Sequence, residues 1–260
     1  MTLRALIISL IILLAASELP ARAQPTLQER IEIGLSKEAV DITSNFAGET
    51  LTIFGAIDNV DPLVQRQGRY DVFVVLTGPA SNIVARRKER VFGVWMNVDN
   101  LELPQVPLSY LVASTRFPRD IAERTTLERL SLDLEHLKLI GDEFLMEAHP
   151  EFLEAVRRIK KDEALYRSFP GGVQFISQSL FKAQLELPAN VPLGQHTARA
   201  YLFKQGALVA QTRTSMVIRK AGLEFAIFEL SRNQGLIYGL ASVLAGLIIG
   251  WLGRIVFKRD

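Results

Sequence analysis

The segment YDVFVVLT, residues 70–77, decides the fold class of this 260-residue chain. Its β-branched and aromatic residues favour a strand, and Gly78-Pro79 after it is a turn signal. Similar short segments lie on both sides, and we interpret them as further strands: Ile31–Leu35, Val40–Ile42, Thr50–Phe54 and Val91–Met96. No helical pattern separates these segments, so residues 24–117 predict a sandwich of the immunoglobulin-like kind rather than a parallel sheet.

The hydrophobic pattern changes its period at Pro118. Thr125-Thr-Leu-Glu128 resembles a capping box, and apolar residues at helical spacing accompany it: Leu127, Leu130, Leu134, Leu137 and Ile140. A second helix is expected to begin at Pro150 and to end before Pro170-Gly-Gly172, with four apolar residues on one face: Phe152, Leu153, Val156 and Ile159. Residues 118–169 therefore predict a helical hairpin that is inserted into a β protein.

Strand signals resume after this insertion, in residues 173–176 and 180–187. Residues 196–203 and 207–218 then predict a closing hairpin across Lys204-Gln-Gly206. The expected fold is therefore mainly β, with a second β portion at residues 170–220. The sequence leaves open whether the two β portions form one sandwich or two.

Two apolar segments lie near the ends of the chain. Residues 1–23 combine a basic start, an apolar stretch and the small-residue site Ala21-Arg-Ala23, which together predict a cleaved secretory signal peptide. A retained anchor is the alternative, but this stretch is shorter than the ~20 residues that span a bilayer. Residues 235–253 carry no charge and predict a transmembrane helix, after a juxtamembrane segment at 221–234 and before a basic cytoplasmic tail at 254–260.

These ends predict a single-pass protein of the bacterial inner membrane, with its N-terminal domain in the periplasm. Small residues recur along one face of the expected span: Gly235, Gly239, Ser242, Gly246, Gly250 and Gly253. Such a stripe lets a second copy or another membrane protein approach closely. The alternative is that glycine is simply common in membrane helices.

Charge and composition exclude several functional classes. Residues 1–23 carry a net charge of +1 and residues 254–260 carry +2, so the chain's formal +2 leaves the outer domain near −1. A nucleic-acid binder needs a dominant basic field, and we therefore expect no nucleic acid as a partner. The chain has no cysteine, which excludes a disulfide framework, a thiol nucleophile and thiolate metal sites.

No pattern typical of catalysis or metal binding is present in the sequence. The three histidines, His136, His149 and His196, are not joined by ligand spacing, and there is no HExxH motif. The G-x-S-x-G and GxxxxGK[ST] motifs are absent too. We therefore predict no catalytic residues, no metal and no cofactor.

The strongest local concentration of charge is a basic run that we expect in a loop between two strands: Arg86, Arg87, Lys88 and Arg90. Guanidinium groups there could bind an oxoanion or a lipid headgroup, whereas the simpler interpretation is a solvated hairpin end. Phe92 and Trp95 flank the run and are expected in the core. A second run, Arg157 to Lys161, is expected on the solvated face of a helix, where Glu154 can pair with Arg158.

Several stretches resemble a family of alphaproteobacterial transmembrane proteins of uncharacterised function. They are residues 70–75 with Gly78-Pro79, Arg86–Arg90 with residues 91–95, and Leu187–Gly194 with Tyr201–Gly206, ahead of the C-terminal span. The likeness covers essentially the whole mature chain. It carries over no catalytic residues, and it implies by association a neighbouring sulfite-exporter-like permease as a partner.

The leading functional hypothesis is a non-enzymatic periplasmic binding or accessory module that acts with a membrane transporter or an envelope complex, or as a homodimer. The anchor favours it because the domain is concentrated next to neighbours in the same bilayer. The alternative is a sensor or carrier of small sulfur oxoanions that uses the run from Arg86 to Arg90. An uncharacterised hydrolase is the third hypothesis.

Overall fold

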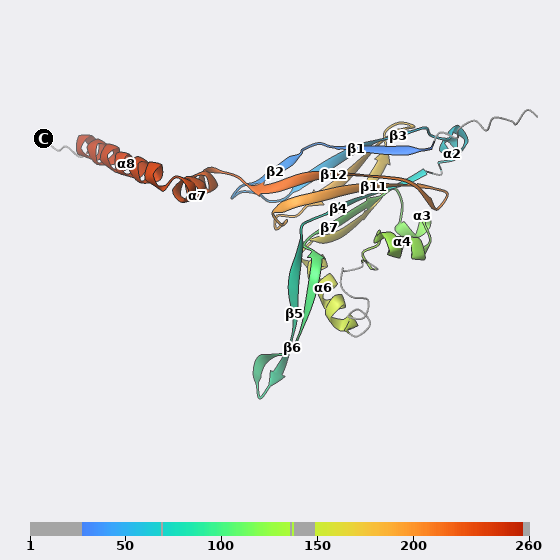
Figure 1. Ribbon diagram of the computed structural model, residues 1–260, viewed down its shortest axis with the longest axis horizontal. Helices are drawn as coiled ribbons and strands as arrows, with labels where there is room; N and C mark the ends of the chain where they lie inside the picture. The colour runs from blue at the N-terminus through green and yellow to red at the C-terminus, as the bar shows by residue number, and fades with distance from the viewer. Residues whose placement is uncertain (1–27, 69, 136, 138–148, 257–260) are drawn as a thin grey trace, which may run out of the picture.

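Twelve strands form three sheets in the computed structural model, which describes residues 28–68, 70–135, 137 and 149–256 (Figure 1). The fold is mainly β, as the sequence predicts. The strands are β1 (Arg30–Leu35), β2 (Ala39–Ile42), β3 (Glu49–Asp58), β4 (Tyr70–Thr77), β5 (Ala80–Val91), β6 (Val94–Pro107), β7 (Tyr110–Ser114), β8 (Tyr166–Pro170), β9 (Val173–Phe175), β10 (Leu180–Leu187), β11 (Gly194–Lys204) and β12 (Ala207–Lys220).

The two β portions share their sheets. One sheet has the order β1-β3-β10-β9, a second has the order β2-β12-β11-β4-β7-β8, and β5 and β6 form a separate two-stranded ribbon. Neighbouring strands are antiparallel except for β2 with β12 and β7 with β8, which are parallel. Because β4 pairs with β11 and β3 pairs with β10, strands from residues 24–117 and 170–220 complete one another in both large sheets.

Strand β4, the segment that suggested the fold class, is buried on both faces. Its alternating side chains enter two different cores: Val72, Val74 and Leu76 pack in the first core with residues of both large sheets. Phe73 and Val75 point to the opposite face and enter a second core. There Phe73 meets Phe203 edge to face, with 5.5 Å between ring centroids. A strand that is covered on both faces needs apolar side chains at nearly every position, which explains the nearly continuous apolar sequence of β4.

The second core is closed by the base of the β5–β6 ribbon and by helices α4 (Arg124–Leu130) and α6 (Pro150–Asp162). A short α3 (Pro118–Ile121) precedes α4, and α2 (Pro62–Arg66) lies between β3 and β4. Figure 1 shows α4 and α6 beside the six-stranded sheet, on the side from which the ribbon extends. The molecule therefore has a sandwich of two sheets with a third, mixed layer against one of them.

The expected first helix of the insertion is wrong in both its start and its length. The N-cap is Glu123 rather than Thr125, and no side-chain hydrogen bond caps the helix. The helix stops after Leu130 because Ser131 adopts a left-handed conformation with φ 54°. Leu132, Leu134 and Leu137 are buried without forming a helix, and Ile140 lies outside the described residues. Burial of leucines thus produced a helical spacing that the backbone does not follow.

The second helix also ends earlier than predicted. It begins at Pro150 as expected, but it ends at Asp162, and Tyr166–Pro170 forms strand β8 beside β7. Ala164, with φ 58°, turns the chain out of the helix. Tyr166 is buried, and its hydroxyl donates to the carbonyl oxygen of Pro107 at 2.6 Å. The helical insertion is therefore shorter than residues 118–169.

The closing hairpin and the apolar C-terminal helix form as the sequence predicts. β11 and β12 form the closing hairpin, with Gln205 and Gly206 at its turn. After β12 come helices α7 (Leu223–Asn233) and α8 (Gly235–Val256). Among the described residues, one helix, Gly235–Arg254, is long and apolar enough to cross a membrane, and no part of it is buried. The predicted signal peptide, residues 1–23, lies outside the described residues.

Candidate functional site

The basic run lies in a strand and not in a loop. Residues Arg86 to Arg90 belong to β5, whose partner β6 starts at Val94. Phe92 and Gly93 form the two-residue turn between them, with φ 49° and 85°. Positive φ at both central positions is the signature of a type I′ turn, whose twist matches that of the flanking strands. The expected strand Val91–Met96 is therefore wrong, because the chain reverses in its middle.

The pairing register divides the charges of the ribbon between two faces. Arg87 pairs across the ribbon with Asp99, and its guanidinium lies 3.7 Å from that carboxylate and 3.3 Å from Glu89. Because side chains alternate along a strand, the remaining cations share the opposite face. They form what we call the cation row: Arg86, Lys88 and Arg90. Trp95 is on this face too, since it pairs with Arg90.

A groove of about 500 Å³ lies between β5 and α6. Apolar side chains contribute part of its lining: Ile83, Val84, Ala85, Phe152, Ala155, Val156 and Ile159. Five cations against one carboxylate, Glu151, supply the charge: Arg86, Arg87, Lys88, Arg158 and Lys160. Arg87 is partly neutralised by its acidic neighbours, so the groove combines an apolar lining with a basic excess.

The groove joins two basic runs that are far apart in the sequence. The sequence predicts that the second run lies on the solvated face of a helix, and the structure contradicts this in part. Arg157 donates from Nη2 to the carbonyl oxygen of Leu137 at 2.8 Å, while Arg158 and Lys160 line the groove. Helical periodicity predicted an apolar face of α6 on which Phe152, Leu153 and Val156 are indeed buried, whereas Ile159 is 51% exposed and lines the groove. The periodicity contained no signal that α6 would lie against β5.

The two aromatic residues that flank the first run are not in the core. Phe92 is fully exposed and Trp95 is 69% exposed, which contradicts the expectation of core packing. Arg90, the fourth predicted anion-binding residue, does not line the groove; its Nε donates to the carbonyl oxygen of Gly93 at 3.2 Å. The register explains both findings, because these residues lie beyond the part of the ribbon that reaches the second core.

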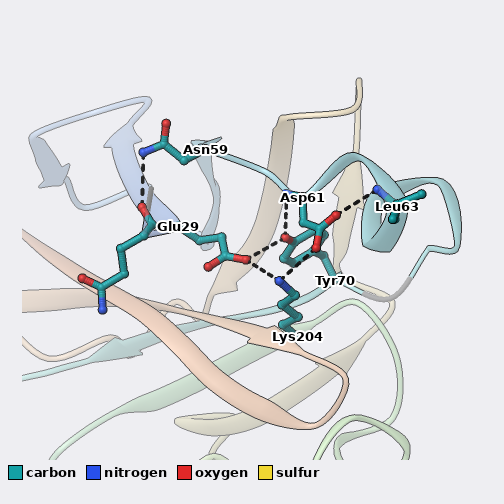
Figure 2. A network of polar contacts seen from close by, with 7 residues as sticks. Glu29, Asn59, Asp61, Leu63, Tyr70 and Lys204 are labelled. Atoms are coloured by element: carbon teal, nitrogen blue, oxygen red, sulfur yellow. Dashed lines mark hydrogen bonds and ion pairs between the residues drawn. The ribbon is translucent and has the colours of Figure 1, made fainter. Parts of the chain in front are cut away.

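A polar network at the start of β1 is a second cluster of charges (Figure 2). The Lys204 ammonium lies 2.7 Å from the Glu29 carboxylate and 3.3 Å from that of Asp61. The Tyr70 hydroxyl donates to Glu29 at 3.1 Å and accepts from the Asp61 backbone N–H at 3.0 Å. The hydrogen bond from Lys204 lowers the pKa of Glu29, and the N–H of Leu63 lowers that of Asp61. These groups satisfy one another, so the cluster ties β1, α2 and β11 together.

A serine and a histidine that no sequence pattern connects form a buried pair. Ser109 Oγ lies 3.3 Å from His196 Nε2, and Nδ1 of His196 lies 3.2 Å from the Gly194 carbonyl oxygen. Both side chains are buried, and Gly78 packs so closely that a Cβ there would lie 2.2 Å from Ser109 Oγ. Burial lowers the pKa of His196. The pair is a sealed polar contact that stabilises the fold.

The small residues of α8 face open space. An added Cβ would meet no neighbouring atom at Gly239, Gly246 or Gly250. Ser242 Oγ donates to the Tyr238 carbonyl oxygen at 2.8 Å, four residues back on its own helix. Packing of this stripe against another helix stays a prediction.

A mainly β domain followed by one apolar helix, counted over the part of the chain that the structure describes, fits a single-pass membrane protein. The family model described as "Putative transmembrane protein (Alph_Pro_TM)" matches residues 30–259. The chain belongs to this family, as the resemblance in its sequence indicates.

Solved structures offer only distant likenesses. The sporulation control protein Spo0M from Bacillus subtilis is 9% identical with a TM-score of 0.28, over 79% of this chain and 55% of that one. AggA, the major subunit of aggregative adherence fimbriae type I from Escherichia coli, is 12% identical with a TM-score of 0.27, over 75% and 96%. The bacterial hydrophobin BslA is 10% identical with a TM-score of 0.22, over 76% and 100%. No curated protein matches the chain.

Proposed function

We propose that this protein is a membrane-anchored binding module that holds an anionic amphiphile in the groove between β5 and α6. The observation that carries the proposal is the composition of the groove, in which an apolar lining lies beside five cations and one carboxylate. Guanidinium and ammonium groups suit a phosphate, sulfonate or carboxylate headgroup. An apolar lining suits the hydrocarbon part of the same molecule, because its burial is favourable by roughly 25 cal/mol per Å².

The two ends of the chain support a place of action for the domain at the inner membrane. The predicted signal peptide favours export of the domain to the periplasm, and α8 would hold it at the inner membrane with residues 254–260 in the cytoplasm. Amphiphiles are concentrated at such a surface. A module there would present or remove its ligand for a neighbouring membrane transporter or envelope complex, whose helix would pack on the small-residue face of α8.

Calorimetry of the full chain in phosphatidylcholine nanodiscs tests the groove, with empty nanodiscs as the blank. Octyl phosphate, inorganic phosphate and octanol separate the contributions of headgroup and chain. Binding of octyl phosphate well above both others supports the proposal. Equal binding of octyl phosphate, inorganic phosphate and sulfate would instead identify a small-oxoanion carrier. The absence of heat with all four compounds would refute a binding function for the groove.

Two matched substitutions test whether the heat measured by calorimetry comes from binding in the groove. Arg158→Gln is expected to weaken octyl phosphate binding about tenfold or more, since a hydrogen bond to a charged group contributes about 1.5–3 kcal/mol. Arg119→Gln changes an equally basic but strongly exposed side chain outside the groove and is expected to bind normally. Equal affinities of the two variants would place the ligand elsewhere.

The partner is tested separately. Affinity purification of the full chain in a mild detergent is expected to recover a specific membrane protein. Recovery of the bait alone would contradict an accessory role but would leave the groove result intact.

A further inference from the structure

The far end of the β5–β6 ribbon carries an exposed apolar tip, formed by Phe92, Val94, Trp95 and Met96. Figure 1 shows the ribbon extending away from the two large sheets, with the turn at its far end. The Phe92 side chain is entirely exposed, and more than half of each of the other three side chains is exposed too. Soluble proteins seldom gather large apolar residues at a projecting turn without a partner for them.

The residue at the turn is not one that the turn itself favours. A type I′ turn requires positive φ at both central positions, and Asn-Gly is its strongest sequence preference. This chain has Phe92-Gly93, so a bulky aromatic residue is held at φ 49°. This backbone conformation is unfavourable for phenylalanine, and the exposed ring of Phe92 is not covered by other side chains of the described residues. The ring therefore indicates a contact made outside this chain's own fold.

The cation row lies directly behind the tip. Arg86, Lys88 and Arg90 share the face of Trp95, whereas Arg87 on the other face lies near Glu89 and Asp99. One face of the distal ribbon is thus basic and ends in an indole. Tryptophan and phenylalanine favour the boundary between headgroups and acyl chains, and cations just outside it are attracted by anionic lipid.

We infer that the apolar tip inserts into the surface of the anionic bilayer that holds α8. The bilayer is the favoured occupant because the charge of the cation row complements anionic headgroups, and because α8 keeps the domain permanently next to that surface. The tip is then a second membrane contact that sets how the β domain sits on the lipid. Arg86 and Lys88 belong both to the cation row and to the groove, whereas Arg90 and the four residues of the apolar tip lie outside the groove, so the tip can be tested apart from the groove.

The test uses Trp95 as its own probe. The chain has two tryptophans, so Trp251→Phe leaves one indole in the full-length protein. This variant is reconstituted into phosphatidylcholine vesicles with and without phosphatidylglycerol. With the anionic lipid, the emission of Trp95 is expected to shift to shorter wavelength, to be quenched by brominated acyl chains and to resist acrylamide. Unchanged emission that remains open to acrylamide in both lipids would overturn the inference.

Two controls separate lipid contact from other causes. Phe117 is exposed on the body of the domain, so Phe117→Trp in a Trp95→Phe, Trp251→Phe background should stay open to acrylamide in either vesicle. Quenching of this probe equal to that of Trp95 would mean that the whole domain lies in lipid and that the tip has no special role. Quenching of Trp95 only by separate brominated vesicles would assign the tip to a facing bilayer and would also overturn the inference.

Charge substitutions report on the cation row. Arg90→Gln, at the cation of the row that does not line the groove, should lower the ratio of inserted to free tip about fivefold in anionic vesicles, because each cation near such a surface contributes about 1 kcal/mol. The change should vanish in pure phosphatidylcholine. An equal effect in both lipids would contradict electrostatic attraction to headgroups, and circular dichroism of the variant confirms that the fold is retained.

Discussion

Replacing Phe92 by Asn should stabilise the ribbon turn while removing the apolar ring from the tip. A left-handed backbone costs an ordinary L-residue about 1–2 kcal/mol, and Asn is among the few residues that adopt it readily. Phe92 has φ 49° and a fully exposed side chain, so its replacement loses no packing inside the fold. We therefore expect Phe92→Asn to stabilise the closed turn by about 1 kcal/mol relative to Phe92→Ala, which removes the ring but keeps the unfavourable φ.

Amide hydrogen exchange of the full chain measures this local effect, because the tip can open without unfolding of the domain. About 1 kcal/mol corresponds to roughly fivefold slower exchange of the backbone amides of residues 89–96 in Phe92→Asn than in Phe92→Ala. Both variants should lose part of the blue shift of Trp95 in anionic vesicles. Equal exchange rates in the two variants would refute the argument that this position carries a conformational cost.

Three further predictions concern the body and the anchor. Arg116→Met should destabilise the domain by about 2–3 kcal/mol in denaturant titrations in detergent, because the buried Asp71 carboxylate loses hydrogen bonds of 2.9 and 2.5 Å; Arg119→Met should have little effect. Burial lowers the pKa of His196, so the unfolded chain gains its proton at a higher pH than the folded chain does. The free energy of unfolding should therefore drop as the pH falls through about 6.5, and His196→Gln should flatten this slope. Leucine in place of Gly239, Gly246 and Gly250 of α8 should weaken crosslinking of the protein to its helix partner in membranes, because the larger side chains prevent close approach. Unchanged crosslinking would refute packing of the small-residue face.

The sequence predicted well those elements whose pattern of apolar and turn residues has one structural interpretation. The run at residues 70–77 became the doubly buried strand β4, and residues 196–218 became the β11–β12 hairpin at the expected turn. The uncharged segment from Gly235 forms helix α8. Its sequence was easy to interpret because a helix of this length that is apolar on every side is typical of a membrane span. In each case the residues involved are close in the sequence.

Predictions failed where a local pattern had two structural meanings. Leu134 and Leu137 follow a helical spacing, yet they are buried in an irregular segment, because burial alone requires apolar side chains. Phe92 and Trp95 looked like core residues because aromatic side chains usually are buried. Their exposure follows from the length of the ribbon, which carries its turn beyond the second core.

The amino-acid sequence by itself determined the mainly β class, the closing hairpin and the apolar C-terminal helix. Only the tertiary structure decided that Arg86 and Lys88 would share a groove with Arg158 and Lys160, and that Trp95 would lie exposed behind the turn. The physical reason is that periodicity orients a side chain only relative to its own strand or helix. Which elements then lie against each other depends on the packing of both cores, and that packing sums contacts between residues far apart in the chain.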